Sequence, residues 1–144
     1  SLKNNNSNNS GVFLIVTNSS DGACGSISQN GANNALFNTS SDYRLKENIT
    51  YDWDATTRLK QLKPARFNFI SHKDIIVDGF LAHEVSDIVP EAITGEKDAV
   101  DDEGNAIYQG IDQSKLVPLL TKAIQEQQEQ IEALQSEINT LKGE

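Results

Sequence analysis

The sequence predicts an α+β protein with a long C-terminal helix, and three successive patterns support this fold class. Residues 1–40 are rich in Asn, Ser and Gly and contain short apolar runs of β type. Residues 41–112 mix short helical patterns with period-two alternation, as a compact α+β domain requires. Residues 113–144 follow a heptad pattern, which is typical of a coiled-coil helix. These changes of pattern set the predicted domain boundaries.

The N-terminal segment is predicted to form short strands separated by polar turns. The apolar run 12–16 and the shorter patch 35–37 favour strands, and Asp-Gly at 21–22 and Asn-Gly at 30–31 are turn signals. About forty such residues bury too little surface to fold alone, so neighbouring chains would have to supply the rest of the core. The alternative is a disordered linker that contains one strand.

The first part of the α+β domain is predicted to be a short helix followed by a strand. Asp54 is a suitable N-cap for a helix over 55–62, which has two leucines three residues apart on one face. The following Lys-Pro pair ends this helix. Residues 65–69 alternate with period two, which places Phe67 and Phe69 on the buried side of a strand.

A second strand over 74–81, a second helix over 82–89 and a returning strand over 106–108 complete the predicted domain. Carboxylates between residues 96 and 103 lack the alternating ligand spacing of an EF-hand loop, so we expect a solvated acidic hairpin there. The second helix is expected to place three apolar side chains inward: Val85, Ile88 and Val89.

The C-terminal region has the most regular pattern in the chain. Apolar side chains recur at heptad a and d positions, and the other positions after Leu120 are mostly Gln, Glu, Ser and Thr. So narrow a stripe demands partner helices, and we expect a parallel homo-oligomeric coiled coil. Ser114 is the expected N-cap, and Pro118 lies early enough that its missing N–H costs little. The seam positions are Val117, Leu120, Ile124, Gln127, Ile131, Leu134, Ile138 and Leu141.

The number of helices in this coiled coil is left open by the heptads. Isoleucine at a with leucine at d favours two strands. The polar Gln127 in the seam is, in contrast, a residue type that sets register and stoichiometry. Both a dimer and a trimer satisfy the pattern.

Charge and cysteine content exclude several classes of function. The formal net charge is −9, and residues 1–40 contribute only Lys3 and Asp21, which cancel. Without a basic face, neither nucleic acid nor an acidic membrane surface is an expected partner. The single cysteine, Cys24, suits a small buried apolar residue, and we expect no metal and no cofactor. No apolar run is long enough to span a bilayer, so we expect a soluble protein made in the cytoplasm.

A short motif lies at the border between the N-terminal segment and the domain. It covers residues 41–49 with the sequence SDYRLKENI, in which Ser41 and Lys46 stand five residues apart. Alone this pair is a weak signal, since most such pairs are surface residues without shared chemistry. A cut at this border would separate two bodies of different composition.

The motif resembles the opening of the self-cleaving intramolecular chaperone domains at the C-termini of phage endosialidases, tail spikes and tail fibres, which also occur in the myelin regulatory factor. The likeness continues through LxxLKPxxF at 59–67, GFLAHEV at 79–85 and LVPLLTKAIQE at 116–126, and it covers roughly residues 41–127. Several ordered motifs together are more specific than any one of them. His83 departs from the pattern, because glutamine is expected there.

The resemblance implies a single-turnover serine endopeptidase that cuts its own chain. It implies that Ser41 is the nucleophile, that Lys46 is its general base, and that the cut falls between Ser40 and Ser41. An amine acts as a base only when neutral, and burial favours its neutral form. Lys46 is solvated in an extended single chain, so we expect oligomer closure to switch on cleavage. The resemblance implies a homotrimer, and whether Lys46 serves the serine of its own chain or of a neighbour stays open.

The other polar residues of the motif are expected to be structural. Arg44 and Glu47 suit an ion pair or an interface contact. Asp42 suits a turn cap, and Asn48 suits a loop that is held by backbone hydrogen bonds.

Histidines and aromatic residues near the motif have no expected catalytic role. His72 and His83 lack ligands or triad partners at suitable spacing. Tyr51 and Trp53 are expected to be packing residues.

These inferences predict an intramolecular chaperone that trimerises a phage tail fibre or spike and then releases itself. Its expected partners are two further copies of itself and the upstream fibre or spike body of the same chain. It would act in the host cytoplasm during assembly, after which the fibre enters the virion tail without it. Two alternatives stay open: a trimerisation module that does not cleave, and a receptor-binding fibre tip that remains attached.

Overall fold

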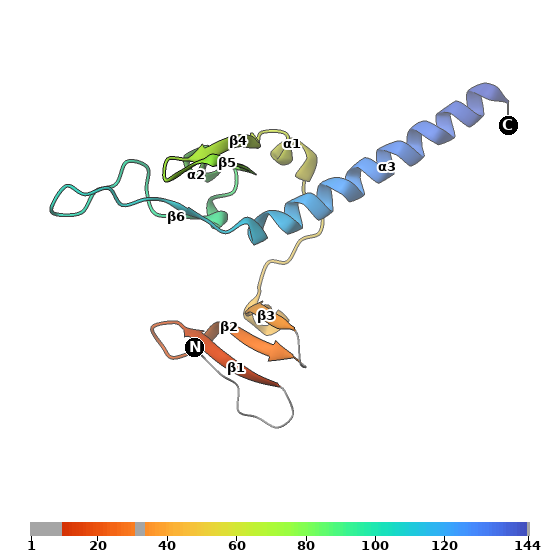
Figure 1. Ribbon diagram of the computed structural model, residues 1–144. Coiled ribbons are helices and arrows are strands. Elements are labelled where there is room, and N and C mark those ends of the chain that lie inside the picture. The colour runs from red at the N-terminus through yellow and green to blue at the C-terminus, as the bar shows by residue number, and fades with distance from the viewer. Residues whose placement is uncertain (1–9, 31–33, 144) are drawn as a thin grey trace. The chain divides into compact units, whose positions relative to one another are not determined.

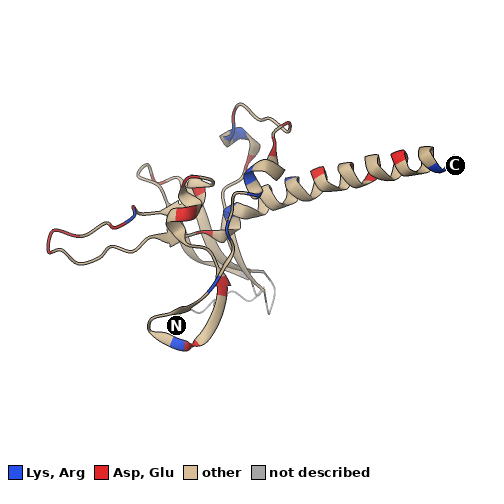
Figure 2. Cartoon of the chain, turned by 90° about the horizontal axis from the view of Figure 1, so that it is seen from above, with Lys and Arg blue, Asp and Glu red and all other residues tan. Residues whose placement is uncertain are grey.

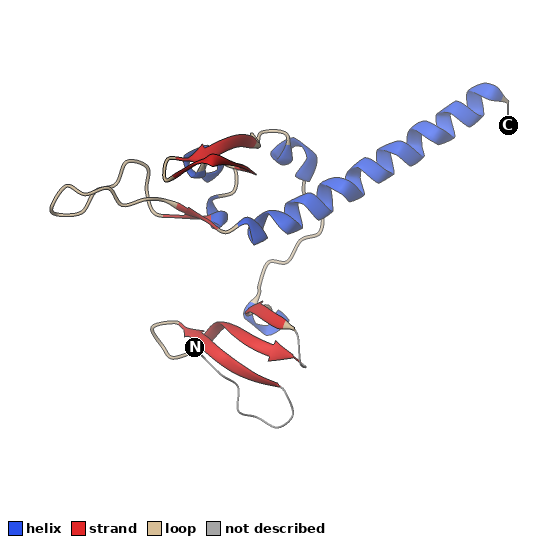
Figure 3. Cartoon of the chain, in the orientation of Figure 1, coloured by secondary structure: helices blue, strands red, loops and turns tan. Residues whose placement is uncertain are grey.

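The computed structural model describes residues 10–30 and 34–143, and the chain divides into two compact units, Ser1–Tyr51 and Asp52–Glu144 (Figure 1). The first unit contains a three-stranded sheet. The second contains two small two-stranded sheets, short helices and one long C-terminal helix, as coloured in Figure 3. This combination of elements confirms the predicted α+β class. The limits predicted after residues 40 and 112 follow composition and stay predictions.

The sheet of the first unit consists of β1 (Ser10–Thr17), β2 (Ala23–Asn30) and β3 (Ala35–Thr39), antiparallel and in that order. The strands expected at 12–16 and 35–37 are therefore present, and the described residues of this segment form a sheet rather than the linker of the alternative. The middle strand, β2, was not predicted from the sequence. It begins Ala-Cys-Gly-Ser, and pattern rules depend on large apolar or β-branched side chains that this run lacks.

A tight turn joins β1 and β2 at the first predicted turn signal. Asn18 Oδ1 accepts hydrogen bonds from the backbone N–H groups of Ser20 and Gly22, each at 2.9 Å. Asp21 takes a φ of 58°, a left-handed conformation that a short polar side chain tolerates. The second signal, at 30–31, extends outside the described residues.

Apolar side chains of this sheet lie open to solvent in the single chain. Val12, Ile15 and Phe37 are all more than half exposed. Cys24 is also exposed, so its expected burial is wrong for the single chain. The reason is that the described residues of the first unit form this one sheet and no second sheet that could pack on it.

The core of the second unit gathers small and aliphatic side chains from several short elements. These elements are α1 (Ala55–Leu59), α2 (Ala82–Ser86), the 3-10 helix η2 (Pro90–Ala92) and the first turns of α3 (Leu116–Lys142). The expected inward positions of the second helix are confirmed, since two are fully buried and Ile88 packs against them. The buried residues are Ala55, Leu62, Val85, Val89, Ala92, Leu116, Leu119 and Ala123.

A β-hairpin of β4 (Ala65–Phe69) and β5 (His72–Gly79) follows α1. The strand predicted at 65–69 is confirmed. Phe67 and Phe69 lie on one face with their ring centroids 5.3 Å apart in a T-shaped arrangement. Phe67 is half-buried, but Phe69 is exposed, so the expected burial is wrong for the second ring.

Several element boundaries differ from those predicted. The helix expected over 55–62 is helical only to Leu59 and continues as a turn, in which Leu62 N–H donates to Leu59 O. The strand expected over 74–81 begins and ends two residues earlier. The helix expected over 82–89 also ends early, because Pro90 starts a separate 3-10 turn.

The strand expected at 106–108 is absent among the described residues. Ala106 makes only an isolated bridge with Val100. The returning strand lies further on, where β7 (Gly110–Ile111) pairs with β6 (Ile93–Thr94). Between these strands the chain forms the exposed acidic loop that the sequence predicts, and Figure 2 shows its acidic positions.

Asp101 organises the tip of this acidic loop. Its carboxylate accepts hydrogen bonds from the backbone N–H groups of Glu103 and Asn105, at 2.9 and 2.8 Å, and from the Asn105 side chain. The Asn105 side chain is the main cause that lowers the pKa of the Asp101 carboxyl, followed by the backbone donors. Asp101 therefore serves as a turn cap.

The long helix α3 has one buried face and one open apolar face. Leu116, Leu119 and Ala123 pack into the core, whereas the predicted seam residues are exposed. Asp112, instead of the expected Ser114, is the capping residue before α3: it caps the 3-10 helix Gln113–Lys115 that leads into α3. Its Oδ1 accepts the Ser114 N–H and Oγ–H at 3.0 and 2.6 Å. Within residues 10–30 and 34–143, no helix has both the length and the hydropathy needed to cross a membrane.

Tyr51 is the last residue of the first unit, and Trp53 belongs to the second. Trp53 is half-buried and packs against the core of the second unit, as expected. Tyr51 is 85% exposed, so its expected packing is wrong for the single chain.

Candidate active site

The side chains of Ser41 and Lys46 meet in the first unit. Lys46 Nζ donates a hydrogen bond to Ser41 Oγ over 2.7 Å. Both residues belong to one chain, so the contact needs no neighbouring copy. A nucleophile and a base within hydrogen-bond reach satisfy the first geometric requirement for nucleophilic catalysis.

A single 3-10 turn, η1 (Tyr43–Leu45), brings these two residues together. Asp42 is its N-cap, and Asp42 Oδ1 accepts the Arg44 backbone N–H at 2.9 Å. Lys46 N–H closes the turn on Tyr43 O at 3.1 Å. Through this turn, two side chains five residues apart come into contact. The expected capping role of Asp42 is thus present in the structure.

Arg44 braces the same turn through Asp42. Its Nε and Nη2 donate to the two carboxylate oxygens of Asp42, each at 2.9 Å. The Arg44 side chain is the main cause that lowers the pKa of the Asp42 carboxyl, and the pair raises the pKa of Arg44 in return. The ion pair expected at Arg44 is therefore with Asp42, while Glu47 is exposed.

Asn48 ends the motif in an unusual backbone conformation. Its φ is 53°, in the left-handed region, which asparagine tolerates better than most residues. Asn48 thus directs the chain out of the turn through its backbone conformation.

Every residue from Ser41 to Thr50 is exposed in the single chain. Tyr43 and Leu45 are 76% and 71% exposed, and Ile49 is more than half exposed. Large apolar side chains beside a polar pair form the kind of surface that assembly covers.

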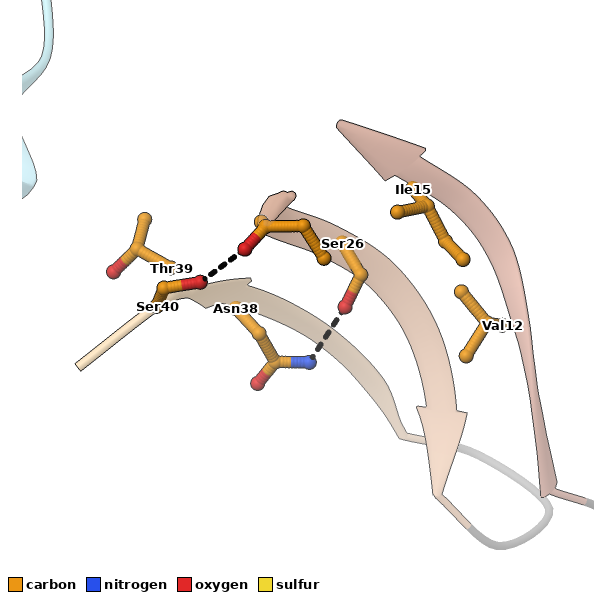
Figure 4. Close-up of a pocket in the computed structure, with 8 residues that line it drawn as sticks. Val12, Ile15, Ser26, Asn38, Thr39 and Ser40 are labelled. Carbon is orange, nitrogen blue, oxygen red and sulfur yellow. Dashed lines mark hydrogen bonds between the residues drawn. The ribbon is translucent and has the colours of Figure 1, made fainter. Parts of the chain in front are cut away.

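Ser40 is attached to β2 by two hydrogen bonds. Its N–H donates to Cys24 O at 3.0 Å, and its Oγ donates to Ala23 O at 2.8 Å. Figure 4 shows this serine at the end of β3, beside a shallow hollow of about 280 Å³. The sequence did not predict these contacts, because their acceptors lie on the strand that pattern rules missed. The hollow is lined by Val12, Ile15, Ala23, Gly25, Ser26, Asn38, Thr39 and Ser40.

The remaining candidate groups lie elsewhere. His72 and His83 belong to the second unit, where the His72 ring contacts Ser71 Oγ at 2.9 Å and His83 is half-buried on α2. Among the residues that the structure describes, no group of three or more His, Cys, Asp or Glu side chains is arranged to hold a metal ion.

Fold and site together define a class of protein: a small α+β domain that carries a long amphipathic helix and follows a Ser/Lys turn at the end of a β-sheet. Comparison with known families finds one similar family, over part of the chain. Residues 41–94 match the family described as chaperone of endosialidase, whose name also classes it as a peptidase family. The resemblance that the motif indicated is therefore confirmed over this range. The matched range begins at Ser41, and the likeness predicted for residues 95–127 stays a prediction. No curated protein matches the chain.

Proposed function

We propose that this chain is an intramolecular chaperone that assembles three copies of a phage fibre or spike and then cuts itself off between Ser40 and Ser41. One observation carries the proposal: Lys46 Nζ lies 2.7 Å from Ser41 Oγ, at the first residue of the segment that matches the chaperone family. This contact supports the proposed roles of Ser41 as nucleophile and Lys46 as base.

The reaction needs only these two side chains, the peptide bond and water. Neutral Lys46 takes the Ser41 hydroxyl proton while Oγ bonds to the carbonyl carbon of Ser40. The bond from that carbon to the Ser41 nitrogen then breaks, and the nitrogen receives the proton from the lysine ammonium. Water adds to the resulting ester and releases the Ser41 hydroxyl. The products are a Ser40 carboxylate and a new amino terminus at Ser41, and each chain reacts once.

Exposure of the pair gives a reason to couple cleavage to assembly. A free lysine amine has a pKa of about 10.4, so it is almost wholly protonated near neutral pH. Burial favours the neutral amine, which is the form that acts as base. In the single chain Ser41 and Lys46 lie in solvent, beside exposed Tyr43 and Leu45. Packing of neighbouring copies over these apolar side chains would remove water from Ser41 and Lys46. The neutral amine would then be favoured, and the reaction could start.

The open face of α3 provides the surface for assembly. Ile131, Leu134 and Ile138 are exposed along one stripe and suit knobs-into-holes packing with the helices of other copies. A tail that associates early raises the effective concentration of the fibre segments attached to it. The trimer follows the family resemblance, since the seam pattern fits two helices as well as three.

Release would complete the cycle. In this proposal the chain acts in the host cytoplasm while the particle is assembled, and the upstream fibre passes to the virion tail. Loss of the chaperone removes the easy path back to separate chains, so the fibre becomes kinetically trapped in its folded form.

Intact-mass spectrometry of freshly folded protein tests the proposal. The parent should yield a fragment that ends at Ser40 and a fragment that begins at Ser41, whereas Ser41→Ala and Lys46→Ala should keep the full mass. A parent that keeps its full mass after assembly would remove the peptidase role. In that case the oligomerisation module without cleavage, which the solvent exposure of residues 41–50 favours, becomes the better function.

A further inference from the structure

We infer that β2 is the strand that presents the bond to be cut, with Ser40 and Gly25 as its positioning residues. The inference rests on the proposed self-cleavage and adds a specific role for the sheet upstream of the cut. In this role, the folded β-sheet of the fibre end is itself part of the active site.

The pairing of β2 with β3 holds the residues before the proposed cut. β2 pairs with β3 so that Gly25 lies opposite Thr39 and Ser26 lies opposite Asn38. The ladder continues one residue past β3, because Ser40 N–H donates to Cys24 O at 3.0 Å. Residues 38–40 are therefore held extended against a strand up to the residue that supplies the scissile carbonyl. Backbone pairing to a strand is a common way to bind an extended peptide.

The Ser40 side chain adds a second anchor at the same place. Its Oγ donates to Ala23 O at 2.8 Å, so backbone and side chain of one residue are both tied to β2. On the other side of the bond, η1 and its Asp42 cap hold Ser41 against Lys46. The peptide bond between Ser40 and Ser41 is thus the short link between two anchored groups. Fixing both reactants favours attack, because less orientational freedom is lost on the way to the transition state.

Gly25 is the third observation. A Cβ at this position would lie 2.8 Å from the backbone oxygen of Asn38, closer than side-chain carbons approach a backbone atom. The obstacle is backbone of the strand that leads to the cut, so it has no flexible side chain that can move aside. Glycine at position 25 therefore allows β3 to approach β2 where Ser40 must be aligned.

A consequence for regulation follows from this geometry. If the β2–β3 ladder is unformed, Ser40 has no fixed orientation and cleavage is slow even when the Ser41–Lys46 pair is assembled. The cut therefore depends on the folded fibre end as well as on the chaperone. An unfolded fibre would keep its chaperone for longer.

Paired substitutions separate this role from general stability. Ser40→Thr keeps the hydroxyl and Ser40→Val removes it with nearly the same shape. We expect Ser40→Thr to cleave within about twofold of the parent and Ser40→Val to cleave about fivefold more slowly, as loss of one hydrogen bond predicts. Cleavage half-times are read on denaturing gels after refolding, and oligomer mass is followed by light scattering.

Gly25→Ala tests the close approach independently, with Gly22→Ala as its matched control. The atoms nearest to a Cβ at Gly22 would belong to the Asn18 side chain, the first at 3.1 Å, in the β1–β2 turn. We expect Gly25→Ala to slow cleavage by about tenfold while assembly persists, and Gly22→Ala to remain near the parental rate. If Gly25→Ala fails to fold, the Ser40 pair alone decides the question.

The outcomes distinguish the two proposals. Cleavage of the parent with equal rates for Ser40→Val and Ser40→Thr would overturn the presenting role of β2 and leave self-cleavage standing. An uncut parent, or a Ser41→Ala variant that is still cut at the same bond, would overturn the proposed function and this inference with it.

Discussion

The carboxylate of Glu126 on α3 binds Thr56 at the start of α1. Glu126 Oε2 accepts hydrogen bonds from the Thr56 backbone N–H at 2.8 Å and from the Thr56 hydroxyl at 2.6 Å. The other oxygen, Oε1, accepts the Ala55 N–H at 3.0 Å. These N–H groups are unpaired within the first turn of a helix, and an anion placed there also meets the positive end of the helix dipole. Glu126 thus joins the long helix to the small domain.

The Glu126 contact predicts a pH-dependent loss of stability. The Ala55 backbone N–H is the main cause that lowers the pKa of the Glu126 carboxyl below its usual value of 4.5, with the Thr56 hydroxyl next. A carboxyl with a lowered pKa in the folded state stabilises the fold above its unfolded pKa and loses this contribution as the pH falls through the folded value.

Glu126→Gln should therefore unfold at a Tm a few degrees below the parent at pH 7. The difference should vanish as the pH falls well below 4.5, because the parent carboxyl is then protonated. Thermal melts followed by circular dichroism at several pH values measure it. Glu132→Gln, an exposed change later on the same helix, is the control. A Tm gap that persists unchanged at low pH would contradict the explanation.

The cap of η1 predicts a modest effect on cleavage. Asp42→Ala removes both the acceptor for the Arg44 N–H and the partner of its guanidinium. The turn that brings Lys46 to Ser41 then loosens, and cleavage should slow by about tenfold. Asp78→Ala is the matched control, because Asp78 makes the same two-point pair with Arg66 on the β4–β5 hairpin. Equal rates for the two variants would show that the cap does not position the pair.

If Lys46 acts as a base, another positively charged side chain at position 46 cannot support cleavage. Lys46→Arg keeps a cation at the site, but a guanidinium stays protonated at any accessible pH. Cleavage should therefore fall by at least about 100-fold in Lys46→Arg, as in Lys46→Ala. Gels over several days measure the residual rate. If arginine supports the parental rate, the lysine acts through its charge and not as a base.

The open seam of α3 predicts that one buried charge prevents assembly. Ile131 is 59% exposed in the single chain, and Ile131→Asp would place a carboxylate in the interface between helices. Light scattering should then report a monomer, and self-cleavage should be lost with the assembly. Ser136→Asp changes an exposed residue outside the predicted seam and should leave the mass unchanged. An Ile131→Asp variant of parental mass would place the interface elsewhere.

Local patterns predicted much of the fold. Asp54 caps α1 as expected, since its side chain accepts the Thr57 N–H at 2.9 Å. The alternation at 65–69 predicted β4, and the heptads predicted the continuous helix α3. Each of these features depends on residues within one or two turns of each other. The serine and lysine pair also falls in this group, because a five-residue turn is enough to bring its side chains together.

Contacts between distant segments were not predictable in this way. The acceptor for the Ser40 hydroxyl lies 17 residues earlier, and Glu126 reaches donors 70 and 71 residues away. Neither partner has a periodic signal, because backbone N–H and C=O groups are the same at every position. Tyr51 and Cys24, which composition suggests are buried, are exposed in the single chain.

By itself, the sequence determined the strand and helix periods, the caps and the spacing of Ser41 and Lys46, because these depend on neighbours along the chain. Only the tertiary structure decided that β2 anchors Ser40 beside the proposed cut and that α3 caps α1 through Glu126. The physical reason is that these bonds join generic backbone groups to side chains far away in sequence, so they exist only once packing has brought both partners to hydrogen-bond distance.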